Sequence, residues 1–236
     1  MKKVFFALIS SFFLMSSAFA DSIIEKYEED CKALIERPKV SLSSSYGRLR
    51  YRFDKDPAYL KEQAMRKQKG TPGVPTHSFE TLGFTKVNDI FDFDFSVAQL
   101  DMGHGYICVY PEEITARLEY LAPTIFVANN LVKDSCLFNL TLRHEKTHMQ
   151  IYIEALDYFL PKLKSYMDHQ FEKIGVKVVL GRETVEKSAQ ELSQIYLKSI
   201  QNKVDEWRQE VGREQAKLDT PEHYVLESQL CDEILP

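Results

Sequence analysis

The chain has 236 residues, 44% of them hydrophobic, which is enough to bury the core of one large domain. Its 30 basic and 35 acidic residues give a formal net charge of −5. This acidity argues against nucleic acid or an anionic membrane as the main partner.

The first twenty residues have the features of a secretory signal. Lys2 and Lys3 precede a short apolar run, and a small-x-small pattern ends at Ala20. We predict cleavage after Ala20 rather than an uncleaved anchor, because the apolar run is short for a membrane span. The mature chain would begin at Asp21, lose two lysines and carry a net charge of −7 (−5 minus 2). The short lysine-led signal is typical of bacteria, so we expect a periplasmic or secreted protein with no stable membrane insertion.

The next segment combines short helices with a predicted hairpin. Residues 22–36 form the pattern of an amphipathic helix, and residues 57–68 indicate a short helix or a turn. Residues 39–54 alternate apolar and polar around Gly47, which predicts a β-hairpin. Residues 69–78 are rich in Gly and Pro and indicate a loop.

Residues 79 to 128 are predicted to be strand-rich. Four strands are expected, at 91–97, 106–110, 114–121 and 123–129. The first alternates with period two, which places its Phe side chains on one face. Asp92 and Asp94 then lie on the opposite face, where a solvated position is favoured over a metal-binding one.

Helices dominate the remainder of the sequence. A largely apolar helix capped by Asp134 or Ser135 is predicted to run to Pro161. A long amphipathic helix follows at 183–217, and a short one begins at Pro221. Strands before helices predict an α+β fold. We expect one domain over 21–236, in which 21–130 is mainly strands, 131–236 is mainly helices, and a mixed or antiparallel sheet packs on the first of these helices.

Four cysteines remain in the mature chain: Cys31, Cys108, Cys136 and Cys231. An even number in an exported protein favours disulfides, and four cysteines allow three pairings. We favour Cys108–Cys136 together with Cys31–Cys231, which would join the two ends. No C-x-x-C is present, so a thiolate zinc site is not expected.

The stretch "RHEKTHMQ" contains an H-E-x-x-H motif in the apolar helix. His144 and His148 lie roughly 40° apart around a helix axis and about 6 Å apart along it, so both can bind one zinc ion. Glu145 lies beside them, where it can take a proton from a water that the zinc activates. The alternative is a solvated surface patch with Arg143 and Lys146. A buried helix favours the motif, because a buried charge needs a partner.

The strand-rich half, "TIFVANN", "SCLFNLTLRHEKTHMQ" and the helical C-terminal half resemble the zincin metallopeptidases. More narrowly, residues 80 to 231 are similar to a family of bacterial exported proteins predicted to be zinc-dependent proteases. The resemblance implies a zincin-like fold, His144 and His148 as zinc ligands, and Glu145 as general base. The family often has Thr two residues before a late His that Gly follows. Here Thr220 lies three residues before His223, and Tyr224 replaces the Gly.

Catalytic zinc takes a third protein ligand, which the motif does not supply. Glu154 has the offset of an extended motif, but a continuous helix would place it about 9 Å further along the axis. The acidic residues of 183–217 are expected to lie mainly on the solvated surface of that helix and not at the zinc. We favour His223, at the start of the last helix after a break, although a plain surface histidine is equally compatible with its position.

Three further side chains, near predicted turns or helix starts, could belong to a site. His104 lies between two glycines, which favours a simple turn between strands over a cleft rim. Tyr224 or Tyr106 could stabilise an oxyanion beside zinc.

These features predict an exported, zinc-dependent metallopeptidase that acts on a protein or peptide substrate. One alternative is a zinc amidase acting on peptidoglycan peptides. The other is a non-catalytic exported binding or assembly protein with a degenerate or coincidental motif.

Overall fold

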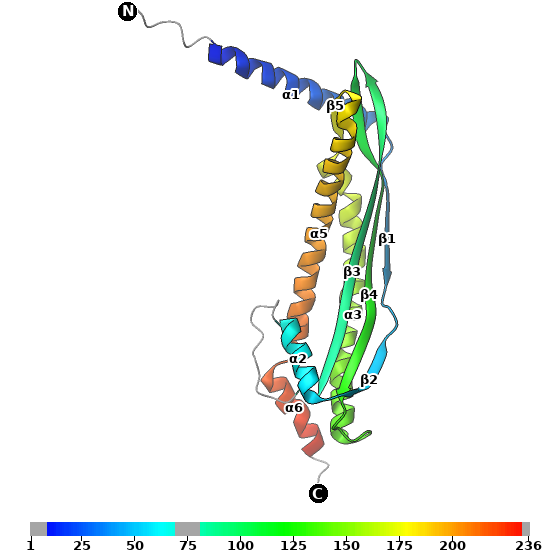
Figure 1. Ribbon diagram of the computed structural model, residues 1–236, viewed down its shortest axis with the longest axis vertical. Helices are drawn as coiled ribbons and strands as arrows, with labels where there is room; N and C mark the ends of the chain where they lie inside the picture. Colours follow the sequence, from blue (N-terminus) through cyan, green and yellow to red (C-terminus); the bar gives the residue numbers. More distant parts are fainter. Residues whose placement is uncertain (1–8, 69–80, 233–236) are drawn as a thin grey trace, which may run out of the picture. The chain divides into compact units, whose positions relative to one another are not determined.

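The structure is a computed structural model, and it describes residues 9–68 and 81–232 (Figure 1). The predicted loop 69–78 lies outside the described residues, and so do residues 1–8 of the predicted signal segment. The chain combines helices with a five-stranded sheet that has both parallel and antiparallel pairs. The α+β prediction is therefore confirmed.

Strand β4 (Tyr106–Ala128) is the centre of the sheet, because every other strand pairs with it. It follows β3 (Gly83–Gly103) through a turn in which Gly103, His104 and Gly105 all have positive φ. The turn predicted at His104 is thus confirmed. The strand predicted at 91–97 lies within β3 and is confirmed. The three predicted at 106–110, 114–121 and 123–129 are wrong as separate elements, because alternating burial continues through both prolines of β4.

The predicted hairpin over 39–54 is also wrong. Its halves form β1 (Lys39–Ser45) and β2 (Arg50–Lys55), but each pairs with β4 instead of with the other. The β2 pairing is parallel, with Arg50 opposite Thr124. Gly47, in the link, has φ of 64°, and a Cβ there would lie 2.3 Å from the Tyr120 carbonyl oxygen. Alternation identifies a strand but not its partner, which here is set by tertiary packing.

The rest of the described chain is mainly helical, and the helices predicted at 57–68, at 183–217 and from Pro221 lie close to those ranges. The N-terminal ones are α1 (Ile9–Leu34) and α2 (Pro57–Gln68), and the later ones are α3 (Cys136–Asp168), α4 (Gln170–Ile174), α5 (Val185–Leu218) and α6 (Pro221–Asp232). Strand β5 (Lys177–Leu180), which was not predicted, pairs with the start of β4. None of the helices in the described ranges has the length and apolar character needed to cross a bilayer.

Helix α3 begins where the sequence indicates but continues beyond the predicted end. The hydroxyl of Ser135 accepts a hydrogen bond from the Phe138 N–H at 3.2 Å and so caps the helix. The helix then runs through Pro161 to Asp168. Leu163 is buried beyond the proline, and this burial offsets the hydrogen bond that a proline removes.

The chain forms two compact units, each assembled from three segments. The first comprises 1–41, 93–115 and 164–200, and the second comprises 42–92, 116–163 and 201–236. In the first, Cys31 and Cys108 lie in a core with Phe171 and Val178.

The second unit is built around aromatic packing between α3, α5 and β4. Trp207 of α5 stacks on Phe159 of α3 with ring centroids 5.2 Å apart, and on Tyr120 of β4 at 6.4 Å. Its indole N–H donates to the Ala155 carbonyl at 3.2 Å. The Tyr120 hydroxyl in turn donates to the Tyr152 carbonyl at 2.7 Å. These contacts fix the middle of α3, on which the candidate site is built.

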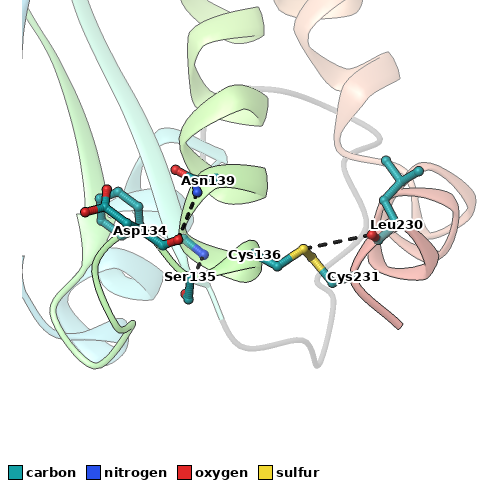
Figure 2. The surroundings of a disulfide bond; sticks show 7 residues. Asp134, Ser135, Cys136, Asn139, Leu230 and Cys231 are labelled. Carbon is teal, nitrogen blue, oxygen red and sulfur yellow. Dashed lines mark hydrogen bonds between the residues drawn. A yellow bond between two sulfur atoms is a disulfide. The ribbon is translucent and has the colours of Figure 1, made fainter. Parts of the chain in front are cut away.

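Two disulfides are present, but not the predicted pair. Cys31 bonds Cys108 within the first unit, and Cys136 bonds Cys231 within the second. Figure 2 shows the second bond, between the start of α3 and the end of α6. Spacing cannot reveal a pairing that depends on which helices meet. Two disulfides indicate an oxidising compartment, in agreement with the predicted location outside the cytoplasm.

Candidate metal centre

The three motif residues lie on the buried side of α3. His144, Glu145 and His148 are 5%, 5% and 6% exposed. Arg143 and Lys146 are exposed on the other side of the helix. The motif is therefore not the solvated surface patch that was the alternative interpretation.

Asp219 joins the two histidines at the end of α5. The Nε2 atoms of His144 and His148 lie 3.1 Å apart. The Oδ1 atom of Asp219 is 3.3 Å from Nε2 of His144 and 3.0 Å from Nε2 of His148. Three atoms that can bind a metal thus form a nearly equilateral triangle.

The other nitrogen of each imidazole is held by an outer partner. Nδ1 of His144 lies 2.9 Å from Glu227 Oε2, and Nδ1 of His148 contacts Gln215 Oε1. Both partner oxygens only accept, so each Nδ1 carries the donated hydrogen. Gln215 also donates to the His148 carbonyl at 2.9 Å. Each Nε2 atom is therefore left as an acceptor, in the arrangement that metal-binding histidines show.

The charges around this triangle favour a positive charge at its centre. Burial by itself lowers the pKa of His144, but the hydrogen bond to Asp219 and the charges of Glu145 and Glu227 raise it to about 9. For Asp219, burial acts to raise the pKa, yet the bonds to His144 and His148 bring it well below its ordinary value. Three acceptor atoms held this close repel one another unless a proton or a metal cation lies between them.

The triangle matches the dimensions of a zinc site. Tetrahedral zinc with bonds of about 2.0–2.2 Å to nitrogen and oxygen holds neighbouring ligand atoms about 3.3 Å apart. The three separations in the site, 3.0 to 3.3 Å, agree with this value. Two histidines and a carboxylate are also a donor set that zinc accepts, with a fourth position left for water or substrate.

The predicted third ligand, His223, lies beside this triangle in a second group. Its Nδ1 atom is 3.7 Å from Glu227 Oε2, and its ring centroid is 5.9 Å from that of His144. His144, His223 and Glu227 together form another set of potential ligand atoms. His223 as a zinc ligand stays a prediction, whereas the distances to His148 favour Asp219. Glu154, which the sequence already disfavoured, is exposed and accepts from Gln150 at 2.9 Å.

The beginning of β3 encloses the carboxylate of Glu145. The Thr85 hydroxyl lies 2.7 Å from Glu145 Oε2 and 2.9 Å from the Glu145 carbonyl. A Cβ on Gly83 would lie 2.4 Å from Glu145 Oε1. Burial raises the pKa of Glu145, although the imidazoles of His148 and His144 act to lower it. The residue is thus a better proton acceptor than an ordinary surface glutamate.

Gly83→Ala is expected to lower the free energy of unfolding by about 1–3 kcal/mol, because the new methyl group would displace the buried carboxylate of Glu145 from its hydrogen bond with Thr85. Denaturant unfolding measures this loss. In a Glu145→Ala background the same substitution should cost much less, since the colliding atoms are gone. An equal cost in both backgrounds would contradict the contact.

Tyr224 is close to the same ligand atoms. Its hydroxyl donates to Asp219 Oδ1 at 2.7 Å and lies 3.5 Å from Nε2 of His144. Burial and the charge of Asp219 raise its pKa, so the phenol stays protonated and can donate. Tyr106, the other predicted oxyanion donor, belongs to the first unit and stacks on Tyr27 at 4.3 Å.

The sequence pointed to the motif but not to the residues that surround it. In the sequence, Asp219 looks like a residue that caps the last helix. In the structure, Thr220 caps that helix instead, because its hydroxyl accepts a hydrogen bond from the His223 N–H at 3.2 Å. Gln215 is buried on the apolar side of α5, and a polar residue at such a position is the signal that could have identified it. Glu227 carries no comparable signal.

Comparison of the chain with protein-family models, with curated proteins and with solved structures found no match.

Proposed function

We propose that this chain is an exported, zinc-dependent metallopeptidase that hydrolyses peptide bonds in a protein or peptide substrate. One observation carries the proposal. Two buried imidazole nitrogens and a carboxylate oxygen lie within 3.3 Å of one another, and a hydrogen-bond partner holds the far nitrogen of each imidazole. Such a set of acceptors favours a metal ion, and it lies directly beside a buried glutamate.

His144, His148 and Asp219 would hold the zinc. When bound, zinc polarises the substrate carbonyl and makes an attacking water more acidic. Glu145 would accept a proton from the attacking water, and its raised pKa suits it to this task. The same carboxyl group can pass the proton to the departing amine. Thr85 holds the carboxylate in place while this happens.

The hydroxyl of Tyr224 is the donor best placed to support a negative oxygen on the substrate. It lies next to Asp219 and His144, so a carbonyl oxygen approaching the ligand atoms comes within its reach. A protonated phenol donates without needing to move charge.

Metal analysis of the purified protein tests the proposal. We expect about one equivalent of zinc, and we expect His148→Ala to lose it, since a three-ligand site binds tightly. His169→Ala is the matched control, because His169 is exposed and its imidazole contacts the Ser165 carbonyl at 2.6 Å, near the end of α3 and away from the ligand triangle. Peptide cleavage followed by mass spectrometry should stop on chelation and return with zinc.

The same metal analysis also shows which result would contradict the proposal. Less than about half an equivalent of zinc, unchanged by His148→Ala, would favour a binding or assembly protein without catalysis.

A further inference from the structure

Helix α6 carries residues that contact the candidate site, although few of its apolar side chains are buried against the rest of the protein. No residue from 221 to 231 is buried. Its apolar side chains Val225, Leu226 and Leu230 are 50%, 63% and 48% exposed. A helix of 12 residues is marginal by itself in water. Other interactions must therefore keep α6 in position.

Those interactions are a few polar contacts and one covalent bond. At its beginning, Thr220 caps the helix. In its middle, the Tyr224 hydroxyl donates to Asp219 at 2.7 Å and Glu227 lies 2.9 Å from Nδ1 of His144. At its end, Cys231 is bonded to Cys136, at the start of α3 (Figure 2). The disulfide attaches α6 to the same helix that carries the H-E-x-x-H motif.

Glu227 is the outer partner that fixes the His144 ring. It is 17% exposed and contacts the nitrogen that faces away from Asp219. Loss of such an outer partner typically weakens metal binding by about 10- to 100-fold. Whatever releases α6 also removes Glu227 from His144.

We propose that Glu227 is a positioning residue for His144, and that the Cys136–Cys231 disulfide sets the metal affinity of the site by holding α6 in place. The proposal rests on the metal site of the proposed function. Reduction by a small-molecule thiol releases the helix. Two molecules of the reductant give up two electrons and two protons and become a disulfide, and the Cys136–Cys231 bond takes them up and becomes two cysteine thiols. A disulfide oxidant reverses the reaction. The chain would thus acquire its full zinc affinity only in an oxidising compartment.

Zinc affinity, measured by competition with a chromogenic chelator, tests the link on the full chain. The Cys136→Ser/Cys231→Ser double variant is expected to bind zinc about 10- to 100-fold more weakly than the oxidised wild type. Hydrogen exchange should show faster exchange over 221–231 in this variant, with residues 136–163 still protected. A mild thiol reductant should weaken the wild type similarly and leave the double variant unchanged.

Substitutions at Glu227 separate positioning from general stability. Glu227→Ala should weaken zinc binding about 10- to 100-fold, whereas Glu227→Gln keeps an acceptor oxygen for His144 and should restore most of the affinity. Glu222→Ala, an exposed acidic residue on the same helix, should change nothing.

Two results overturn the inference. One is a double variant with wild-type zinc affinity, and the other is equal loss in Glu227→Ala and Glu227→Gln. Either leaves the proposed function standing. If the oxidised wild type binds no zinc, the proposed function itself fails.

Discussion

Glu145→Gln is expected to lower the rate of peptide hydrolysis by about 10²- to 10⁴-fold while zinc stays bound, because general-base catalysis contributes about that much. Glutamine has nearly the same shape and can still accept from Thr85, so the enclosure of the side chain by β3 is preserved. What it lacks is the ability to take a proton. Initial cleavage rates and zinc content, measured on the same preparation, test both parts.

Glu154→Gln provides the matched control for this substitution. Glu154 lies on the same helix but is exposed and accepts a hydrogen bond from Gln150 within that helix. It should leave both rate and zinc content unchanged. A Glu145→Gln protein that cleaves peptides at the wild-type rate would rule out the proposed mechanism.

Asp219→Ala is expected to reduce zinc affinity by more than the roughly 10- to 100-fold that loss of an outer partner costs, since it removes a ligand atom itself. His223→Ala should have a much smaller effect, because its contact with the site passes through Glu227 at 3.7 Å. Chelator competition on both variants decides between the ligand that the geometry favours and the one that the sequence favours.

A control acid checks that the effect of Asp219 is local. Glu210 lies earlier on α5, is 59% exposed and pairs with Arg213. Glu210→Ala should retain full zinc affinity. If His223→Ala instead loses zinc and Asp219→Ala keeps it, the ligand set of the site is His144, His148 and His223.

Local patterns were sufficient for much of the fold. Helices α2, α5 and α6 follow their predicted ranges, because apolar spacing and the turn residues between them act over a few neighbours. The capping of α6 by Thr220 and Pro221 is likewise local. The partners of β1 and β2 were not predictable in this way, because alternation fixes which face is buried and not which strand lies alongside.

For the candidate site, the sequence by itself placed His144, Glu145 and His148 on one side of a buried helix. The 3.6-residue repeat of a helix guarantees that arrangement wherever the helix lies. Only the tertiary structure brought Asp219, Gln215 and Glu227 to the two imidazoles, and only it paired Cys136 with Cys231. These residues lie 67 to 95 positions from their partners along the chain. Contacts over such distances depend on how whole helices pack, which no short sequence pattern encodes.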